Sequence, residues 1–152
     1  ILVGIKVPEN QFQSLIDLAS DTSPDGGIII ERARGDFPSL LMNCSLSISQ
    51  GGYNTLMESI RAGCHSIIVP YAGGLETEQT LRAKFLAERN FITLLEENNL
   101  SSIAIANAIN QSLTASSPNW DNYKKDKTSF IRTNGASNSA HQVASWAKHL
   151  NW

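Results

Sequence analysis

Residues 49–58 read Ser-Gln-Gly-Gly-Tyr-Asn-Thr-Leu-Met-Glu and follow a short apolar run that ends at Ile48. The paired glycines separate that run from a segment in which Leu56 and Ile60 recur with helical spacing. A strand that passes through a glycine-containing loop into a helix is the building unit of α/β folds. This stretch therefore predicts a strand, a tight loop and a helix in direct succession.

The same alternation continues outward from this stretch in both directions. Short apolar runs, typical of strands that are buried on both faces, lie at residues 1–7, 28–30, 46–48, 67–69 and 91–95. Segments with helical spacing lie at residues 12–19, 56–63, 81–86 and 105–113, with Gly63 ending the second and Ser101 placed to cap the last. This order predicts the α/β class: a Rossmann-like parallel sheet with right-handed crossovers and helices on both faces.

The pattern changes after residue 115. A Ser-Ser-Pro-Asn stretch at 116–119 is followed by a polar region with two amphipathic segments, 120–131 and 139–150. We therefore expect a Rossmann-like domain over residues 1–115. Residues 116–152 are expected to form C-terminal helices that pack on that domain or on a missing N-terminal domain.

Composition excludes several classes of protein. The 152 residues include 12 basic and 14 acidic side chains, a net charge of -2, which argues against a nucleic-acid partner. No apolar run reaches the length of a membrane span, and the two cysteines favour free thiols in a reducing compartment. We expect a cytoplasmic location. Because the first residue is Ile1 and not Met, we also expect the chain to be a piece of a longer protein.

The loop at residues 49–55 has the chemistry of an anion site. Its glycines allow close approach of the backbone to a ligand, and the helix that follows offers free N–H groups and the positive end of its dipole. Such a site suits phosphate, and Glu58 on the same helix could accept hydrogen bonds from a ribose diol. The alternative is a plain turn with Asn54 or Thr55 as N-cap and Glu58 as its capping-box partner.

A second loop, at residues 72–79, follows the Val-Pro pair at the end of the next predicted strand. Because ligands bind at the carboxyl ends of parallel strands, we expect both loops to face one crevice. Glu78 and Gln79 place an acid beside an amide, and together these groups can bind several sugar hydroxyls. The alternative is that Glu78 only complements the helix dipole. Arg82 is expected to be a solvated helix residue.

Taken in order, these motifs resemble the C-terminal half of GT-B glycosyltransferases. The resemblance is closest to glycosyltransferase family 28, the group that contains the bacterial peptidoglycan GlcNAc transferase, and covers roughly residues 39–113. It is carried by the stretch 49–58, Ala62-Gly63, Val69-Pro70, Glu78-Gln79 and Arg82-Ala83. Two departures are Gln50, where related UDP-glycosyltransferases often carry His, and Cys64-His65, where a hydrophobic residue and Pro are usual.

The resemblance implies a site for a nucleotide-sugar donor, usually a UDP-sugar. The loop that would hold the diphosphate contains Ser49, Gln50, Gly51, Gly52, Asn54 and Thr55, of which Gly52, Asn54 and Thr55 match the positions closest to phosphate. Glu58 matches the acid that binds the ribose, and Glu78 and Gln79 match the pair that contacts the donor sugar. The nucleobase of the donor would lie near residues 32–37. The UDP-sugar is a substrate, so no cofactor is expected, and no DxD-type metal motif is present.

The implied activity of the full-length protein is that of a hexosyltransferase, which moves a sugar to a hydroxyl acceptor. Its acceptor site and catalytic base would belong to an N-terminal domain of the same chain, so this fragment alone would be inactive. Two alternatives stay open: a UDP-sugar hydrolase or 2-epimerase domain, and a non-catalytic donor-binding subunit that needs a partner chain. The acceptor, the transferred sugar and peripheral association with the inner membrane face are also left open.

Overall fold

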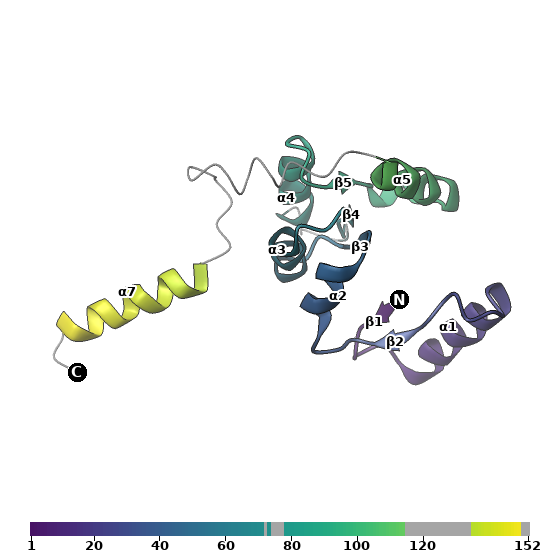
Figure 1. The fold of residues 1–152 in the computed structure, drawn as a ribbon, viewed down its shortest axis with the longest axis horizontal. Coiled ribbons are helices and arrows are strands. Elements are labelled where there is room, and N and C mark those ends of the chain that lie inside the picture. The colour runs from purple at the N-terminus through teal and green to yellow at the C-terminus, as the bar shows by residue number, and fades with distance from the viewer. Residues whose placement is uncertain (72, 74–77, 115–134, 150–152) are drawn as a thin grey trace. The chain divides into compact units, whose positions relative to one another are not determined.

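The computed structural model describes residues 1–71, 73, 78–114 and 135–149, of which residues 147–149 are described as backbone only. The chain divides into two compact units, Ile1–Leu40 and Leu41–Trp152. Figure 1 shows the elements of each unit. No helix among the described residues combines the length and the apolar character that a membrane span needs.

The first unit contains two short parallel strands and a helix. Strand β1 (Leu2–Val3) pairs with β2 (Glu31–Arg32), and helix α1 (Glu9–Thr22) lies between them in the sequence. The expected helix is confirmed, whereas the strand expected at residues 28–30 is wrong. Backbone hydrogen bonds place the pairing directly after that run, since Glu31 N donates to Ile1 O at 3.0 Å and Ala33 N donates to Val3 O at 2.9 Å. Ile29 is consequently 64% exposed.

Arg32 gives a physical reason for the shifted strand. Its guanidinium donates to the Val7 carbonyl at 2.6 Å and pairs with Glu9 at 2.7 Å. It also lies over the Phe12 ring, 4.0 Å from the centroid. These contacts tie β2 to the loop and helix that follow β1. The strand therefore includes the charged Arg32, whereas hydrophobicity alone would place it at residues 28–30.

Helix α2 (Phe37–Asn43) was not expected from the sequence. The Asp36 carbonyl accepts the first bonds of this helix, from Ser39 N at 2.9 Å and Leu40 N at 3.2 Å. Pro38 stands in the first turn, where a missing N–H group costs nothing. An Asp followed by a proline two residues later was therefore the available signal of a helix start.

The second unit is built on a three-stranded parallel sheet. Its strands are β3 (Ser47–Gln50), β4 (Ser66–Val69) and β5 (Thr93–Leu94), in the order β3-β4-β5. Each overlaps a strand that the sequence predicts. Ile48 pairs with Ile67, which pairs with Thr93, and the same register aligns Ser49 with Ile68.

Helices follow these strands as expected. The unit contains α3 (Tyr53–Ala62), α4 (Glu78–Ala87), the short 3-10 helix η1 (Glu97–Asn99), α5 (Ser102–Thr114) and α7 (Gly135–His149). Helix α7 covers most of the amphipathic segment expected at 139–150 and begins four residues earlier. The segment expected at 120–131 lies outside the described residues, and the division at residue 115 stays a prediction.

Two predicted helix ends are confirmed. Gly63 ends α3 in the left-handed conformation, with φ at 71°, and its N–H donates to the carbonyls of Ser59 and Ile60. Glycine adopts this conformation at no steric cost, which is why it terminates many helices. At α5, the Ser101 hydroxyl accepts a hydrogen bond of 3.1 Å from Ala104 N, the expected side-chain cap.

Helices cover both faces of the three-stranded sheet. Ile68 of β4 is buried in a cluster with Leu56 and Ile60 of α3 and with Ala83 and Leu86 of α4. Adjacent strand residues point to opposite faces, so the fully buried Ile67 faces the other side. On that second side, Thr93 of β5 shares a hydrogen bond of 3.1 Å with Ser112 of α5. The α/β class with helices on both faces is thus confirmed.

Candidate functional site

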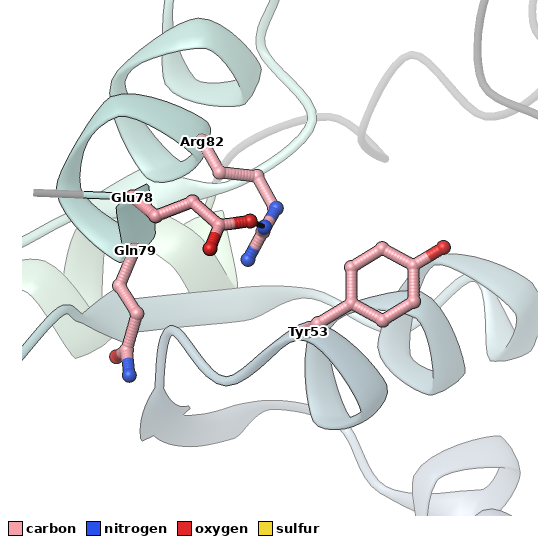
Figure 2. A pocket seen from close by; sticks show the side chains of 4 residues that line it. All are labelled: Tyr53, Glu78, Gln79 and Arg82. Carbon is pink, nitrogen blue, oxygen red and sulfur yellow. Dashed lines mark hydrogen bonds and ion pairs between the residues drawn. The ribbon is translucent and has the colours of Figure 1, made fainter. Parts of the chain in front are cut away.

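A pocket of about 270 Å³ lies in the second unit, between the starts of α3 and α4. The described side chains that line it are those of Tyr53, Glu78, Gln79 and Arg82 (Figure 2). Tyr53 is the first residue of α3, and Glu78 is the first residue of α4. The two loops that the sequence analysis selected therefore lead into helices that meet at one pocket.

The first turn of α3 leaves backbone donors without partners inside the helix. The N-cap is Gly52, which makes no side-chain cap, and the first intrahelical bond runs from Leu56 N to Gly52 O at 3.0 Å. Asn54 and Thr55 lie inside the helix, so neither is the N-cap and Glu58 is not a capping-box partner. The capping alternative is therefore wrong. The N–H groups of the first turn lack helical acceptors and carry the positive end of the dipole.

Gly51 brings the loop after β3 against the start of α4. A Cβ atom built on Gly51 would lie 3.4 Å from Pro70 Cβ and 3.5 Å from Gln79 Cβ. Gly51 itself is buried. The strand–helix loop therefore lies close to the residues that follow β4, with space for a methyl group but little more, as a shared crevice requires.

Arg82 differs from its expected role as a solvated residue. Only 21% of its side chain is exposed, because its guanidinium pairs with Glu78 one turn earlier and lies 5.1 Å from the centroid of the Tyr53 ring. Figure 2 shows the guanidinium between that carboxylate and that ring. Arg82 is thus a pocket residue, and the expectation of a solvated side chain is wrong.

Glu78 and Gln79 lie beside each other at the pocket, as their adjacency in the sequence predicts. The Glu78 side chain is 82% exposed and its partner is Arg82. The Gln79 side-chain oxygen accepts a hydrogen bond of 3.4 Å from Tyr71 N, which fixes the amide against the loop that follows β4. The pocket therefore offers an accessible carboxylate and a positioned amide.

The remaining predicted residues surround the loop and the first turns of α3. Ser49 is half-buried on β3, and its Oγ is buried with no hydrogen-bond partner among the described residues. Gln50 and Asn54 are exposed, and Thr55 is half-buried. These side chains are not among those that line the pocket.

Glu58 is half-buried on α3 and is also outside the pocket lining. It lies five residues after Tyr53, about 140° around the helix from it. The segment expected to hold the nucleobase, residues 32–37, falls in the first unit, whereas the pocket belongs to the second.

Two of the four described lining residues, Tyr53 and Arg82, lie outside the site predicted from the sequence. Tyr53 directly follows the glycine pair and so begins the helix at the loop. Arg82 stands four residues after Glu78, which places both on one face of α4. Among the described lining side chains, the acid Glu78 is balanced by the base Arg82. Among the described residues, no three His, Cys, Asp or Glu side chains gather as metal ligands.

Comparison with known proteins gives a consistent family. A family model described as "Glycosyltransferase family 28 C-terminal domain" matches residues 17–143. Among curated proteins, the UDP-N-acetylglucosamine--N-acetylmuramyl-(pentapeptide) pyrophosphoryl-undecaprenol N-acetylglucosamine transferase of Exiguobacterium sp. is 37% identical over 78 residues. This match covers 51% of the chain and 22% of the relative. The protein of the same name from Borrelia turicatae is 28% identical over 99 residues, covering 65% of the chain and 25% of the relative.

A solved structure supports the same architecture. MurG from Acinetobacter baumannii matches 83% of the chain and 42% of its own length, with a TM-score of 0.57 and 17% identity. At that identity the likeness shows the fold alone. The chain matches about a quarter or less of the length of these two curated relatives.

Proposed function

Because the chain belongs to the family of glycosyltransferase family 28 C-terminal domains, we propose that it binds the nucleotide-sugar donor of a glycosyltransferase. The donor class is a UDP-sugar. The curated relatives carry names that specify UDP-N-acetylglucosamine as donor, which favours an N-acetylhexosamine sugar here. The full-length protein would transfer this sugar to a hydroxyl acceptor.

One observation carries this proposal. The first turn of α3 has backbone donors without helical acceptors, and it adjoins a pocket that contains a carboxylate, an amide and a guanidinium. The backbone donors suit a diphosphate, while the carboxylate and the amide suit sugar hydroxyls. Among the described lining side chains one acid balances one base, which is compatible with an anion that is bound mainly by backbone groups.

The roles of the residues are assigned from the resemblance of their motifs to those of the family. The loop and first turn, Ser49 to Thr55, would hold the diphosphate, with Gly52, Asn54 and Thr55 closest to it. Glu58 would bind the ribose diol, and Glu78 and Gln79 would bind the sugar. The buried Ser49 hydroxyl, which has no hydrogen-bond partner among the described residues, supports a polar ligand at the loop because such a group is costly to leave unsatisfied.

The chemistry would rest on the leaving group. When the bond between sugar and diphosphate breaks, negative charge grows on the diphosphate oxygens. Preorganised N–H groups at a helix start stabilise that charge as it forms, without any need for solvent to reorganise. The acceptor site and the base that activates the acceptor hydroxyl would come from an N-terminal domain of the same protein.

Isothermal titration calorimetry of the folded chain with UDP and UDP-N-acetylglucosamine tests the proposal. We expect binding of both ligands at millimolar concentration or below, and weaker binding of uridine, which lacks the diphosphate. A folded sample that binds neither UDP nor its sugar would overturn the proposal. Product analysis of the full-length protein then separates the activities: transfer needs an acceptor, hydrolysis releases free sugar, and 2-epimerisation changes the sugar.

A further inference from the structure

We propose that Arg82 is a ligand of the donor diphosphate, and that it reaches the diphosphate by exchanging its partner Glu78 for phosphoryl oxygens. This inference rests on the proposed function. Arg82 supplies the basic group among the described side chains that line the pocket. Its present partners are the Glu78 carboxylate on the same helix and the Tyr53 ring at the start of α3.

The two partners of Arg82 differ in how firmly they hold it. The Glu78 side chain is 82% exposed, so water screens this ion pair and its carboxylate can be released at little cost. The Tyr53 ring instead supports the guanidinium through its face, a contact that leaves the N–H donors free to point elsewhere. The guanidinium can therefore turn from the carboxylate to another anion while it stays above the ring.

A diphosphate is the anion that fits this exchange. Tyr53 is the first residue of α3, so the guanidinium stands beside the helix start that is proposed to hold phosphate. Arginine presents a planar pair of donors that matches two phosphoryl oxygens at once. In the exchanged state, the positive charge of the guanidinium on the diphosphate offsets the repulsion between the diphosphate and the nearby Glu78 carboxylate. Once released, Glu78 is free to accept hydrogen bonds from sugar hydroxyls.

The competing interpretation is an ordinary surface ion pair. A Glu and an Arg four residues apart stabilise many helices and need no ligand. The chain contains a matched example in Arg89, which lies 3.7 Å from the centroid of the Phe85 ring and 3.6 Å from the Glu88 carboxylate. Arg89 is not among the residues that line the pocket. It therefore separates the effect of losing an arginine on an aromatic ring from the effect of losing a diphosphate ligand.

Calorimetry with UDP, together with ligand-observed NMR for uridine, tests the exchange on the Arg82→Gln, Arg82→Lys and Arg89→Gln variants. We expect Arg82→Gln to weaken UDP binding at least tenfold and to leave uridine binding unchanged. Arg82→Lys, which keeps the charge but loses the planar fork, should fall between wild type and Arg82→Gln. Arg89→Gln should bind UDP like wild type. The salt dependence of UDP binding should also be shallower in Arg82→Gln.

Glu78→Gln adds a signature that a structural ion pair does not produce. Without the carboxylate, Arg82 is no longer held, so UDP should bind as tightly as in wild type or more tightly. Binding of the UDP-sugar relative to UDP should fall, because a charged acceptor for the sugar hydroxyls is lost. In the surface-pair interpretation, Arg82→Gln and Glu78→Gln change thermal stability alone.

The outcomes separate the two proposals. If wild type binds no UDP, the proposed function falls and the role of Arg82 falls with it. If wild type binds UDP and Arg82→Gln binds it equally well, the exchange alone is overturned. Equal weakening of UDP and uridine in Arg82→Gln would also overturn it, because the arginine would then act on the shape of the pocket. Circular dichroism verifies the fold of each variant, and Arg82→Lys serves as the test if Arg82→Gln does not fold.

Discussion

Gly51, the first residue after β3, lies against Gln79 in the first turn of α4, where a Cβ atom on Gly51 would be 3.5 Å from Gln79 Cβ. The two residues are 28 positions apart in the sequence. Their contact joins the loop proposed to hold phosphate to the pair proposed to hold the sugar. A ligand that spans a diphosphate and a sugar therefore requires both loops to keep this close approach.

The contact at Gly51 predicts that the free energy of unfolding depends steeply on the size of the side chain at this position. Gly51→Ala should be tolerated, because its methyl group would meet Pro70, Gln79 and Ile68 at 3.4 to 3.5 Å, which is ordinary van der Waals contact. Gly51→Val adds two further methyl groups to the same space and should destabilise the fold by about 1–3 kcal/mol. Urea denaturation of both variants measures the difference. Equal stability of the two would contradict the close approach.

Gly63 should be sensitive even to alanine. It has a φ of 71°, a conformation in which a Cβ atom costs about 1–2 kcal/mol, although no neighbouring atom would clash with it. Gly63→Ala should therefore lower the free energy of unfolding by about that amount. Gly35→Ala is the matched control, because its surroundings are equally open and its φ is outside the left-handed region. Similar losses in both variants would argue against a conformational origin.

Glu58→Ala should weaken UDP binding and leave the fold intact. No hydrogen bond or ion pair of the Glu58 side chain occurs within the described part of the chain, and α3 is capped at Gly52 without it. Hydrogen bonds to a charged group contribute about 1.5–3 kcal/mol each, so one lost bond corresponds to about a 10- to 100-fold weaker affinity. Calorimetry measures the affinity, and the exposed Glu88→Ala is the control. Normal UDP binding by Glu58→Ala would refute the ribose assignment.

The thiol of Cys44 should lose its proton at a higher pH in the folded chain than in the unfolded chain. Burial raises the pKa of Cys44, and the neighbouring Cys64 thiol raises it further. Because the pKa of Cys44 is raised in the folded state, its thiol contributes to the free energy of unfolding below the pKa of the unfolded thiol, about 8.5. This contribution is lost as pH rises through the folded-state pKa. The alkylation rate of Cys44 as a function of pH, read by peptide mass spectrometry, should rise at higher pH in the native chain than in urea. Coinciding profiles would contradict this expectation.

Much of the second unit could be predicted from local patterns. The apolar runs before and after the 49–58 stretch are strands, and Leu56 and Ile60 are indeed on the buried face of α3. Gly63 and Ser101 end and begin helices where the sequence placed them. These features depend on side-chain periodicity and on backbone preferences, which are properties of short segments.

The errors occurred where long-range contacts overrode local preference. The β2 strand lies at Glu31–Arg32 because its pairing with β1 and the partners of Arg32 outweigh the hydrophobicity of residues 28–30. Arg82 is a pocket residue because the Tyr53 ring, 29 positions away in the sequence, lies beneath its guanidinium. The pairing of β2 with β1 cannot be identified from the segment around Arg32, and the Tyr53 ring cannot be identified from the segment around Arg82.

The sequence by itself determined the α/β class, the order of strands and helices in the second unit, and the two loops at which a site was sought. Those features follow from periodicity and turn chemistry, which act over a few residues. Only the tertiary structure decided that Gly51 meets Gln79 and that Tyr53 and Arg82 complete a pocket with Glu78. Parallel strands bring their carboxyl ends to one edge of the sheet, but the side chains that meet there depend on how α3 and α4 pack across β4.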